Sequence, residues 1–373
     1  MSSLTSSDIQ SIMTQKDLDN KLLMTSPLVT IVVSPRERFS CTRESLESIY
    51  EYTKIPFNLI YIDGSSPPKV RRYLEDLAQA KDFQLIRTDY YLSPNQARNL
   101  GLRQVKTKYV VFIDNDVIVS PGWLNHLVQC AEETGATIVG PLACQDKPLH
   151  EIVHCAGGET HVWLDTKGDQ VRRRLREKMY KQGRRVEELR DQLQRKQTEL
   201  AEFHCVLVRT EIFKQVGSLD EAMLNTKEHL DFCMSVIQAG GTVYFESACV
   251  VTYVPGPPLE WTDLHYYMLR WSDAWQLASL HRLREKWDLA EDGYFQAKYK
   301  KVGWRRKVSI IGPLNRRLTF GLSSRLFDPI LVPLDKALNR YLTTRHAQRQ
   351  SHSSQAQGST LPYQSSVIAS SRS

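Results

Sequence analysis

The sequence has no long apolar run and no paired cysteines. No stretch reaches the roughly 18 uninterrupted apolar residues that a membrane span requires. Its seven cysteines are an odd number without any CxxC pair, which argues against a disulfide framework and a zinc knuckle. The start, MSSLTSSDIQ, also lacks the basic and then apolar layout of a secretory signal. We therefore expect a cytoplasmic protein with reduced thiols, most of them in the core.

Net positive charge is nearly absent over most of the chain, although the formal net charge is +7. Residues 167–200 hold twelve Lys and Arg against six Asp and Glu, so this segment carries a surplus of six. The net charge thus describes one segment and not a basic fold, and we expect no nucleic-acid partner. The apolar positions of the segment fit helical spacing if Gln182 and Lys196 are counted as part of the apolar stripe along one helix face. This predicts one long helix, or a hairpin bent near Gly183.

From residue 28 onward, apolar runs alternate with segments of helical spacing. The runs are 28–34, 57–66, 83–89 and 108–114, and the helical segments between them are 43–53, 69–80 and 95–106. Runs that are apolar on both faces and alternate with helices predict an α/β fold with a mostly parallel sheet, covered on each side. Ligands bind such sheets beyond the carboxyl ends of the strands, where Ser34, Asp63 and Asp114 fall.

The same patterns predict four parts of the chain. Residues from 346 onward are rich in Ser and Gln and almost without core formers, which is typical of disorder. We predict a loose lead-in over 1–27, a sheet domain over 28–258 with a basic helical insertion at about 167–200, a helical C-terminal extension over 259–345, and a disordered tail over 346–373.

Two acids close the fourth apolar run in the stretch FIDNDV. Asp114 and Asp116 repel each other at this spacing, and a divalent ion such as Mg²⁺ takes carboxylate oxygens while keeping sites for substrate phosphates. Asp116 could supply that contact, with Asp114 reaching a sugar hydroxyl or stabilising the loop. The alternative is that DND only forms an Asx turn at the end of a strand.

Three further polar groups follow other strands. Asp63, in YIDGSS, can accept hydrogen bonds from a nucleobase or a ribose, although Asp before Gly is also a common turn. Asn95 opens a helix, and Arg98 in its first turn is placed to meet a base or a phosphate, unless it is only solvated. The stretch TKEHLDFC places Glu228, His229 and Asp231 at a helix start. These groups can remove a proton or merely cap the helix.

In this order, the segments VTIVVS, IDGSS, NQARNLG, FIDNDVIVSPGWL, VLVRTEIFKQVGSLDE and KEHLDFC resemble glycosyltransferase family two on the GT-A fold. The resemblance covers roughly residues 28–255. It implies a nucleotide-diphospho-sugar donor, a divalent metal (Mn²⁺ or Mg²⁺) and inversion at the anomeric carbon. By matching position it implies that Asp63 and Arg98 contact the base, Asp114 the ribose or sugar, and Asp116 the metal.

The chain departs from the family at the predicted base. Many members have Glu-Asp where this chain has Glu228 and His229, and the second position commonly provides the base. His229 could take that role because its ordinary pKa of roughly 6.5 suits neutral pH. Asp231 and Glu228 remain alternatives. Ser34 and Asn95 complete the predicted nucleotide-sugar-binding set.

These residues predict an inverting, metal-assisted glycosyltransferase of the hexosyl or N-acetylhexosaminyl type, acting on a hydroxyl of a glycan or lipid-linked acceptor. Two alternatives stay open. One is a catalytically silent glycan-binding or scaffold protein on the same fold. The other is a sugar nucleotidyltransferase, although that class needs a glycine-rich phosphate loop and VVSPRERFS contains no glycine.

The basic segment 167–200 has several alternative roles. It can be a solvated surface, pair with another copy, cover the acceptor cleft, or rest on an anionic membrane with the clusters at 305–307 and 316–317. In the last case the protein is peripheral at the inner face of the membrane.

Overall fold

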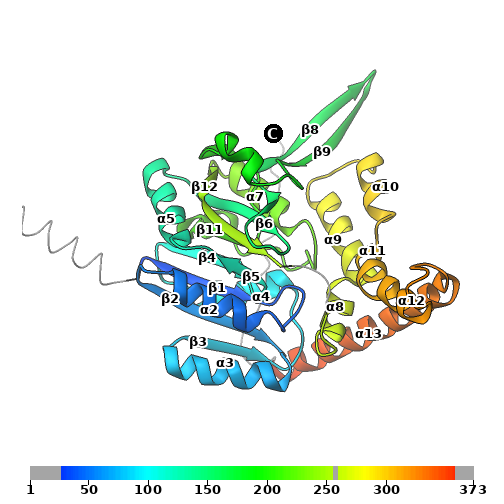
Figure 1. The fold of residues 1–373 in the computed structure, drawn as a ribbon. Helices are drawn as coiled ribbons and strands as arrows, with labels where there is room; N and C mark the ends of the chain where they lie inside the picture. Colours follow the sequence, from blue (N-terminus) through cyan, green and yellow to red (C-terminus); the bar gives the residue numbers. More distant parts are fainter. Residues whose placement is uncertain (1–26, 255–258, 358–373) are drawn as a thin grey trace, which may run out of the picture.

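The computed structural model describes residues 27–254 and 259–357 (Figure 1). The predicted lead-in therefore lies outside the described residues except for its last residue, Pro27.

A ten-stranded sheet forms the centre of the molecule, with its main path in the order β10-β12-β6-β11-β4-β1-β2-β3. Strands β1 to β4 and the pair β6 and β12 are joined by parallel pairings, whereas β11 runs antiparallel to both β4 and β6. The predicted α/β fold with a mostly parallel sheet is confirmed. The strands are β1 Val29–Ser34, β2 Phe57–Gly64, β3 Gln84–Thr88, β4 Tyr109–Asp114, β5 Val117–Val119, β6 Ile138–Gln145, β7 Ile152–Cys155, β10 Lys196–Thr198, β11 Cys205–Arg209 and β12 Val243–Tyr253.

Helices pack on both faces of this sheet because its strands are apolar on both sides. Ile31 of β1 packs in a core with Leu46 of α2 and Trp123 of α5, while its neighbour Val32 packs in a second core with Ala97 of α4. The covering helices are α2 Thr42–Tyr52, α3 Pro68–Lys81, α4 Pro94–Leu102, α5 Trp123–Thr134, α6 Phe213–Val216 and α7 Glu228–Gln238, with the 3₁₀ turn η2 Thr210–Ile212 before α6.

Helix α4 lies very close to the sheet. A Cβ atom on Gly101 would stand 2.3 Å from Cγ1 of Val32, so no other residue fits there without a shift of the strand. At the other end of α4, Ser93 and Gln96 form a capping box. The two features fix the first turn of α4, which carries Asn95 and Arg98, against the carboxyl end of β1.

The predicted helix over 167–200 is wrong. The segment belongs to a long antiparallel hairpin of β8 Gly158–Lys167 and β9 Gln170–Met179, which projects from the body (Figure 1), followed by η1 Glu187–Gln192. Gly168, at φ +57°, lies in the turn that pairs Lys167 with Gln170. Two arginines of β9 pair with acids of β8, Arg174 with Asp165 at 2.8 Å and Arg176 with Glu159 at 2.7 Å. The pairing of β9 with β8, with cross-strand ion pairs added to it, therefore holds the hairpin, and the periodicity of the segment does not contain that pairing.

The C-terminal region is helical, as predicted. Its elements are α8 Leu264–Arg270, α9 Asp273–Lys286, α10 Gly293–Tyr299, α11 Trp304–Arg306, the π-helix η3 Lys307–Ile311, α12 Gly312–Leu318 and α13 Asp328–Gln357. Buried Arg306 links α11 to α9 and α13, because its guanidinium donates hydrogen bonds to Asp273 and Asp335. Helix α13 continues to Gln357, so the predicted start of a disordered tail at 346 is too early, and residues 358–373 lie outside the described residues. None of the helices in the described ranges is long and apolar enough to cross a membrane.

Candidate active site

A pocket of about 380 Å³ lies where the carboxyl edge of the sheet meets the C-terminal helices. Its lining includes Arg36 from the loop after β1, Glu228 and His229 from the start of α7, and Arg305 from α11. Neither arginine was predicted as a site residue, although Arg305 lies in the basic cluster at 305–307. Arg36 was detectable in principle, because it lies two residues beyond the end of a predicted strand, whereas Arg305 reaches the pocket only through the packing of the C-terminal helices.

Asp114 is held by three buried partners. Its Oδ1 accepts a hydrogen bond from Nη2 of Arg98 at 3.0 Å. Its Oδ2 lies 3.1 Å from Nδ1 of His204 and 3.5 Å from Nε of Arg36. Each charge in this group thus has a counter-charge, which buried ions require.

Asp116 has the opposite environment. Its side chain is fully buried, and within the described residues neither carboxylate oxygen has a hydrogen-bond partner. Burial, followed by the negative charges of Asp114 and Glu37, raises the pKa of Asp116 well above its usual range, although Arg36 and Arg38 act against this. A buried carboxylate beside other acids fits a divalent cation. Asp116 does not line the pocket in the described structure, so its neighbours must move before an ion reaches it.

The predicted nucleotide contact Asp63 is engaged in a local network. Its Oδ1 accepts from the backbone N–H of Ser66 at 2.8 Å, and its Oδ2 accepts from Oγ of Ser66 and from Arg87. Asp63 and Arg87 are register partners in β2 and β3, so the ion pair follows from the sheet. The turn alternative therefore accounts for the contacts of Asp63, and the structure does not bring this residue into the pocket.

Ser34, Asn95 and Arg98 surround Asp114. Ser34 is the register partner of Asp114 across β1 and β4. Arg98 is fully buried, and its guanidinium carbon lies 4.1 Å from the ring centroid of Phe203. Asn95 accepts a hydrogen bond from Arg98 through Oδ1 at 3.3 Å. Arg98 is thus a buried structural cation, and a role in contacting a base would require it to leave Asp114.

The fold places the three candidate bases in different environments. Glu228 lies within 3.4 to 3.8 Å of three buried guanidinium groups, those of Arg36, Arg98 and Arg270. Burial alone would raise the pKa of Glu228, but the charges of Arg270, Arg36 and Arg98 outweigh it and lower that pKa. Glu228 is therefore a weak base.

The other two candidates face different neighbours. His229 lines the pocket, and its Nε2 lies 3.3 Å from Oε1 of Glu202. Asp231 instead accepts hydrogen bonds from Nζ of Lys286 and Nε1 of Trp287, each at 2.8 Å, and does not line the described pocket. Of the three, only Glu228 and His229 are placed to meet a pocket ligand.

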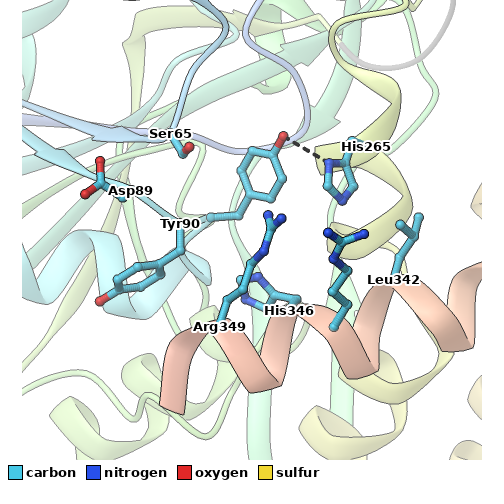
Figure 2. A pocket seen from close by; sticks show the side chains of 9 residues that line it. Ser65, Asp89, Tyr90, His265, Leu342, His346 and Arg349 are labelled. Atoms are coloured by element: carbon cyan, nitrogen blue, oxygen red, sulfur yellow. Dashed lines mark hydrogen bonds between the residues drawn. The ribbon is translucent and has the colours of Figure 1, made fainter. Parts of the chain in front are cut away.

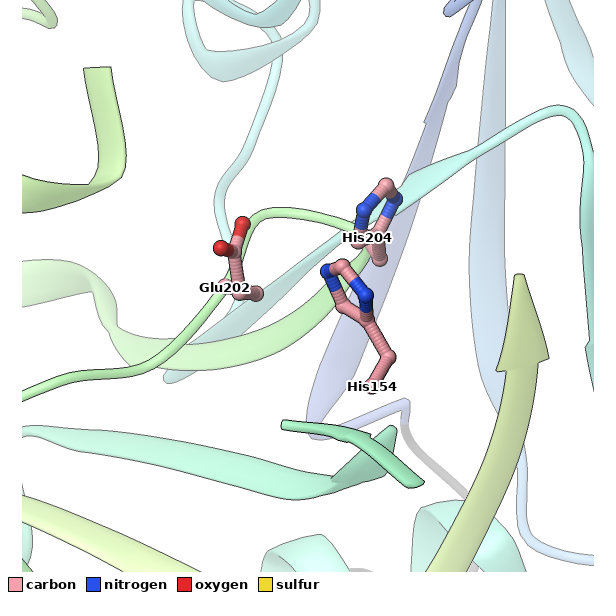
Figure 3. A group of neighbouring side chains, drawn as sticks. All are labelled: His154, Glu202 and His204. Atoms are coloured by element: carbon pink, nitrogen blue, oxygen red, sulfur yellow. The ribbon is translucent and has the colours of Figure 1, made fainter. Parts of the chain in front are cut away.

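The structure also brings His154, Glu202 and His204 together in the pocket wall (Figure 3). One ligand atom from each lies within 4.8 Å of the others. Burial lowers the pKa of both His154 and His204. Sequence reasoning missed this group because the two histidines are far apart in the chain. The sequence carries no spacing that marks the group, since His154 lies in β7 and His204 just before β11.

A second, smaller pocket of about 140 Å³ lies between α13 and the segment that follows β3 (Figure 2). Tyr91, His265 and Arg349 line it, and Oη of Tyr91 lies 3.5 Å from Nδ1 of His265. Ser65, in the same turn as Asp63, also lines this pocket. Asp89, His265 and His346 line the smaller pocket, whereas the larger one contains the candidate bases Glu228 and His229.

Comparison with known proteins places the chain among the glycosyltransferases. The model of glycosyl transferase family 2 matches residues 30–217, just over half of the chain. The chain therefore belongs to glycosyltransferase family 2, as the sequence motifs indicated. The match spans β1 to α6, including the strand ends that carry Ser34, Asp63, Asp114 and Asp116.

Curated relatives are more distant. The chain is 25% identical over 226 residues to the pre-mycofactocin glycosyltransferase of Mycobacterium tuberculosis, covering 60% of this chain and 42% of that one. It is 24% identical over 224 residues to the uncharacterized protein y4gI of Sinorhizobium fredii, covering 58% of this chain and 23% of that one. The chain thus spans less than half the length of these relatives.

Among solved structures, the chain is similar to that of GalNAc-T7 with UDP, GalNAc and Mn²⁺. The TM-score is 0.47 at 13% sequence identity, and the superposition covers 75% of this chain and 57% of that one.

Proposed function

We propose that the protein transfers a sugar from a nucleotide-diphosphate donor to a hydroxyl of a glycan or lipid-linked acceptor, with inversion at the anomeric carbon. The observation that carries the proposal is the fully buried carboxylate of Asp116, next to a pocket lined by Arg36 and Arg305. A divalent ion, Mn²⁺ or Mg²⁺, held by Asp116 would neutralise the charge that develops on the leaving diphosphate. The guanidinium groups of the pocket are suited to bind the phosphates themselves.

His229 is the base in this proposal. In a direct displacement, the acceptor hydroxyl loses its proton while it attacks the anomeric carbon from the face opposite the diphosphate. Glu228 is too strongly paired with arginines to take that proton, and Asp231 is paired outside the pocket. His229 lines the pocket, and Glu202 at 3.3 Å both orients its ring and stabilises the imidazolium that forms.

The test is turnover of a panel of UDP and GDP sugars by the purified full-length chain, with and without Mn²⁺. Transfer or donor hydrolysis that requires Mn²⁺ and is lost in Asp116→Asn supports the proposal. The matched control is Asp76→Asn, which removes an exposed carboxylate on α3. Donor binding without turnover would instead favour the catalytically silent glycan-binding protein. Release of pyrophosphate from a nucleoside triphosphate and a sugar phosphate would favour the nucleotidyltransferase.

We also propose that the protein rests on an anionic membrane surface through its C-terminal helices. Phe320 and Leu322 are 95% and 91% exposed, and the exposed side chains of Leu318, Leu326 and Ile330 continue the apolar surface. The exposed arginine pair at 316–317 adds positive charge to the same helical region. Apolar side chains flanked by arginines suit the boundary between headgroups and acyl chains. Such a location fits a lipid-linked acceptor.

Liposome flotation tests this location. Binding to vesicles with anionic lipid, but not to neutral ones, and its reduction in Phe320→Ser/Leu322→Ser support the proposal. Leu164→Ser is the matched control, because it removes an exposed leucine from the tip region of the β8–β9 hairpin. Equal flotation with both lipids, or loss only in Leu164→Ser, would contradict it. Self-association through 167–200 is the alternative, and sedimentation velocity of the same variants would detect it.

A further inference from the structure

We propose that His154, Glu202 and His204 bind one divalent transition-metal ion, at a site separate from Asp116. The inference does not depend on the transferase activity. One potential ligand atom from each residue lies within 4.8 Å of the other two, which is close enough for one ion to bind all three after small side-chain shifts. The three side chains come from β7 and from the segment that leads into β11, so the rigid sheet holds them together (Figure 3).

The hydrogen bonds of both rings leave Nε2 available as the ligand atom. Nδ1 of His154 lies 3.0 Å from Oε1 of Gln145, an oxygen that can only accept, so this nitrogen carries the proton. Nδ1 of His204 lies 3.1 Å from Oδ2 of Asp114, a carboxylate that accepts in the same way. Histidine ligands in metal centres commonly donate their other N–H to a carboxylate or an amide oxygen, which fixes both tautomer and orientation.

Packing also fixes the rings. The ring of Tyr253 stacks on His204 with centroids 3.9 Å apart, and His154 meets His204 edge to face at 5.1 Å. Glu202 is buried and has two oxygens, of which Oε1 faces His229. The second oxygen is sufficient for one metal–ligand bond. The site is therefore preorganised, and a metal ion would need little rearrangement to bind.

The donor set determines which ion fits. Two imidazole nitrogens and one carboxylate oxygen suit Zn²⁺ and neighbouring transition ions, whereas Mg²⁺ prefers oxygen ligands alone. All three residues line the pocket, so a coordination position of the ion would face the space where a substrate binds. The Asp116 site, in contrast, offers oxygen ligands only. The two sites should differ in metal preference.

The experiment measures metal binding and not activity. The full-length chain is stripped with a chelator and dialysed against Zn²⁺ without nucleotide, and bound metal is determined by mass spectrometry. A separate metal-free sample is titrated with Co²⁺ as a second probe, because the visible absorption of bound Co²⁺ reports its coordination geometry. We expect about one equivalent of Zn²⁺ and a Co²⁺ spectrum in the wild type, in Asp116→Asn, and in His126→Gln, which alters a histidine on α5 outside the group.

Both signals should be lost in His154→Gln and in Glu202→Gln, two variants from different segments that serve as checks on each other. Circular dichroism identifies any variant that fails to fold. Absence of stoichiometric Zn²⁺ in the wild type would overturn the inference, as would retention of the ion in both folded variants. Loss of the ion in Asp116→Asn would also overturn it, because the histidines would then belong to the Asp116 site. Failure of the transferase proposal would leave all of these outcomes unchanged.

Discussion

Asp114 and Asp116 lie two residues apart at the end of β4, and both are fully buried, yet their surroundings are opposite. Asp114 is paired with Arg98, Arg36 and His204. Asp116, among the residues that the structure describes, has no hydrogen-bond partner for either oxygen. A buried carboxylate without a hydrogen-bond partner costs free energy, so a fold that retains one does so for a ligand or for a reaction. We therefore propose that Asp114 has a structural role and that Asp116 is the functional candidate.

The largest expected effect follows from Asp116→Asn. Loss of the carboxylate removes the proposed metal contact at the leaving diphosphate, and we expect kcat for Mn²⁺-dependent transfer to fall on the order of 10²–10³-fold. The variant should remain folded because Asn fills the same volume. Steady-state kinetics with saturating Mn²⁺ measure the change. An unchanged kcat would show that Asp116 does not act in the transfer reaction.

The second effect concerns stability. Asp114→Ala leaves Arg98, Arg36 and His204 buried without their carboxylate, and breaking such a group costs about 3–5 kcal/mol of unfolding free energy. Urea denaturation of Asp114→Ala and Asp116→Asn measures the loss of unfolding free energy in each variant. Asp116→Asn should lose little or no stability under the same conditions. Equal losses in the two variants would show that their environments do not differ in solution.

The pH dependence sharpens the contrast further. The pKa of Asp116 is raised by burial, so the native state binds more protons than the unfolded state at pH values above the ordinary carboxyl pKa of about 3.9. Stability from this group therefore falls as pH rises through that window. Metal-free Asp116→Asn should melt roughly 2–4 °C above the wild type at pH 7, and the gap should close towards pH 4. A gap that grows on acidification would contradict the raised pKa.

The smallest effect is expected at Asp231. Its partners Lys286 and Trp287 lie outside the lining of the pocket, so Asp231→Asn should cost roughly 1 kcal/mol of stability and leave kcat almost unchanged.

His229→Gln, two positions earlier on α7, is the comparison variant for Asp231→Asn and should lose most of the transfer rate. Kinetics of both variants, with thermal unfolding as the control, test this. The opposite pattern would move the base to Asp231.

Local sequence patterns predicted the first four strands of the sheet, because hydrophobic periodicity within each segment is sufficient to identify them. The apolar runs from 28 to 114 became β1 to β4, and polar residues after them fell at one edge of the sheet. The β8–β9 hairpin was missed because it depends on pairing with a strand that was not recognised, with contacts such as the ion pair of Arg174 and Asp165. Periodicity within residues 167–200 does not contain that information.

The candidate site was predictable only in part, for a similar reason. The motif FIDNDV located both aspartates, but their opposite environments depend on distant side chains such as His204 on Asp114. The ion pair of Asp63 with Arg87 depends on the register of β2 and β3. The group of His154, Glu202 and His204 has no fixed spacing in sequence, and tertiary structure alone assembles it.

The most direct test of the central claim is calorimetric titration of UDP and GDP into the full-length chain, with Mn²⁺ and with a chelator. If Asp116 holds the cation that binds the donor's phosphates, one nucleotide should bind much more tightly with Mn²⁺, and Asp116→Asn should abolish that difference while binding in chelator stays the same. Nucleotide affinity that does not depend on Mn²⁺, or a dependence that survives in Asp116→Asn, would contradict the account.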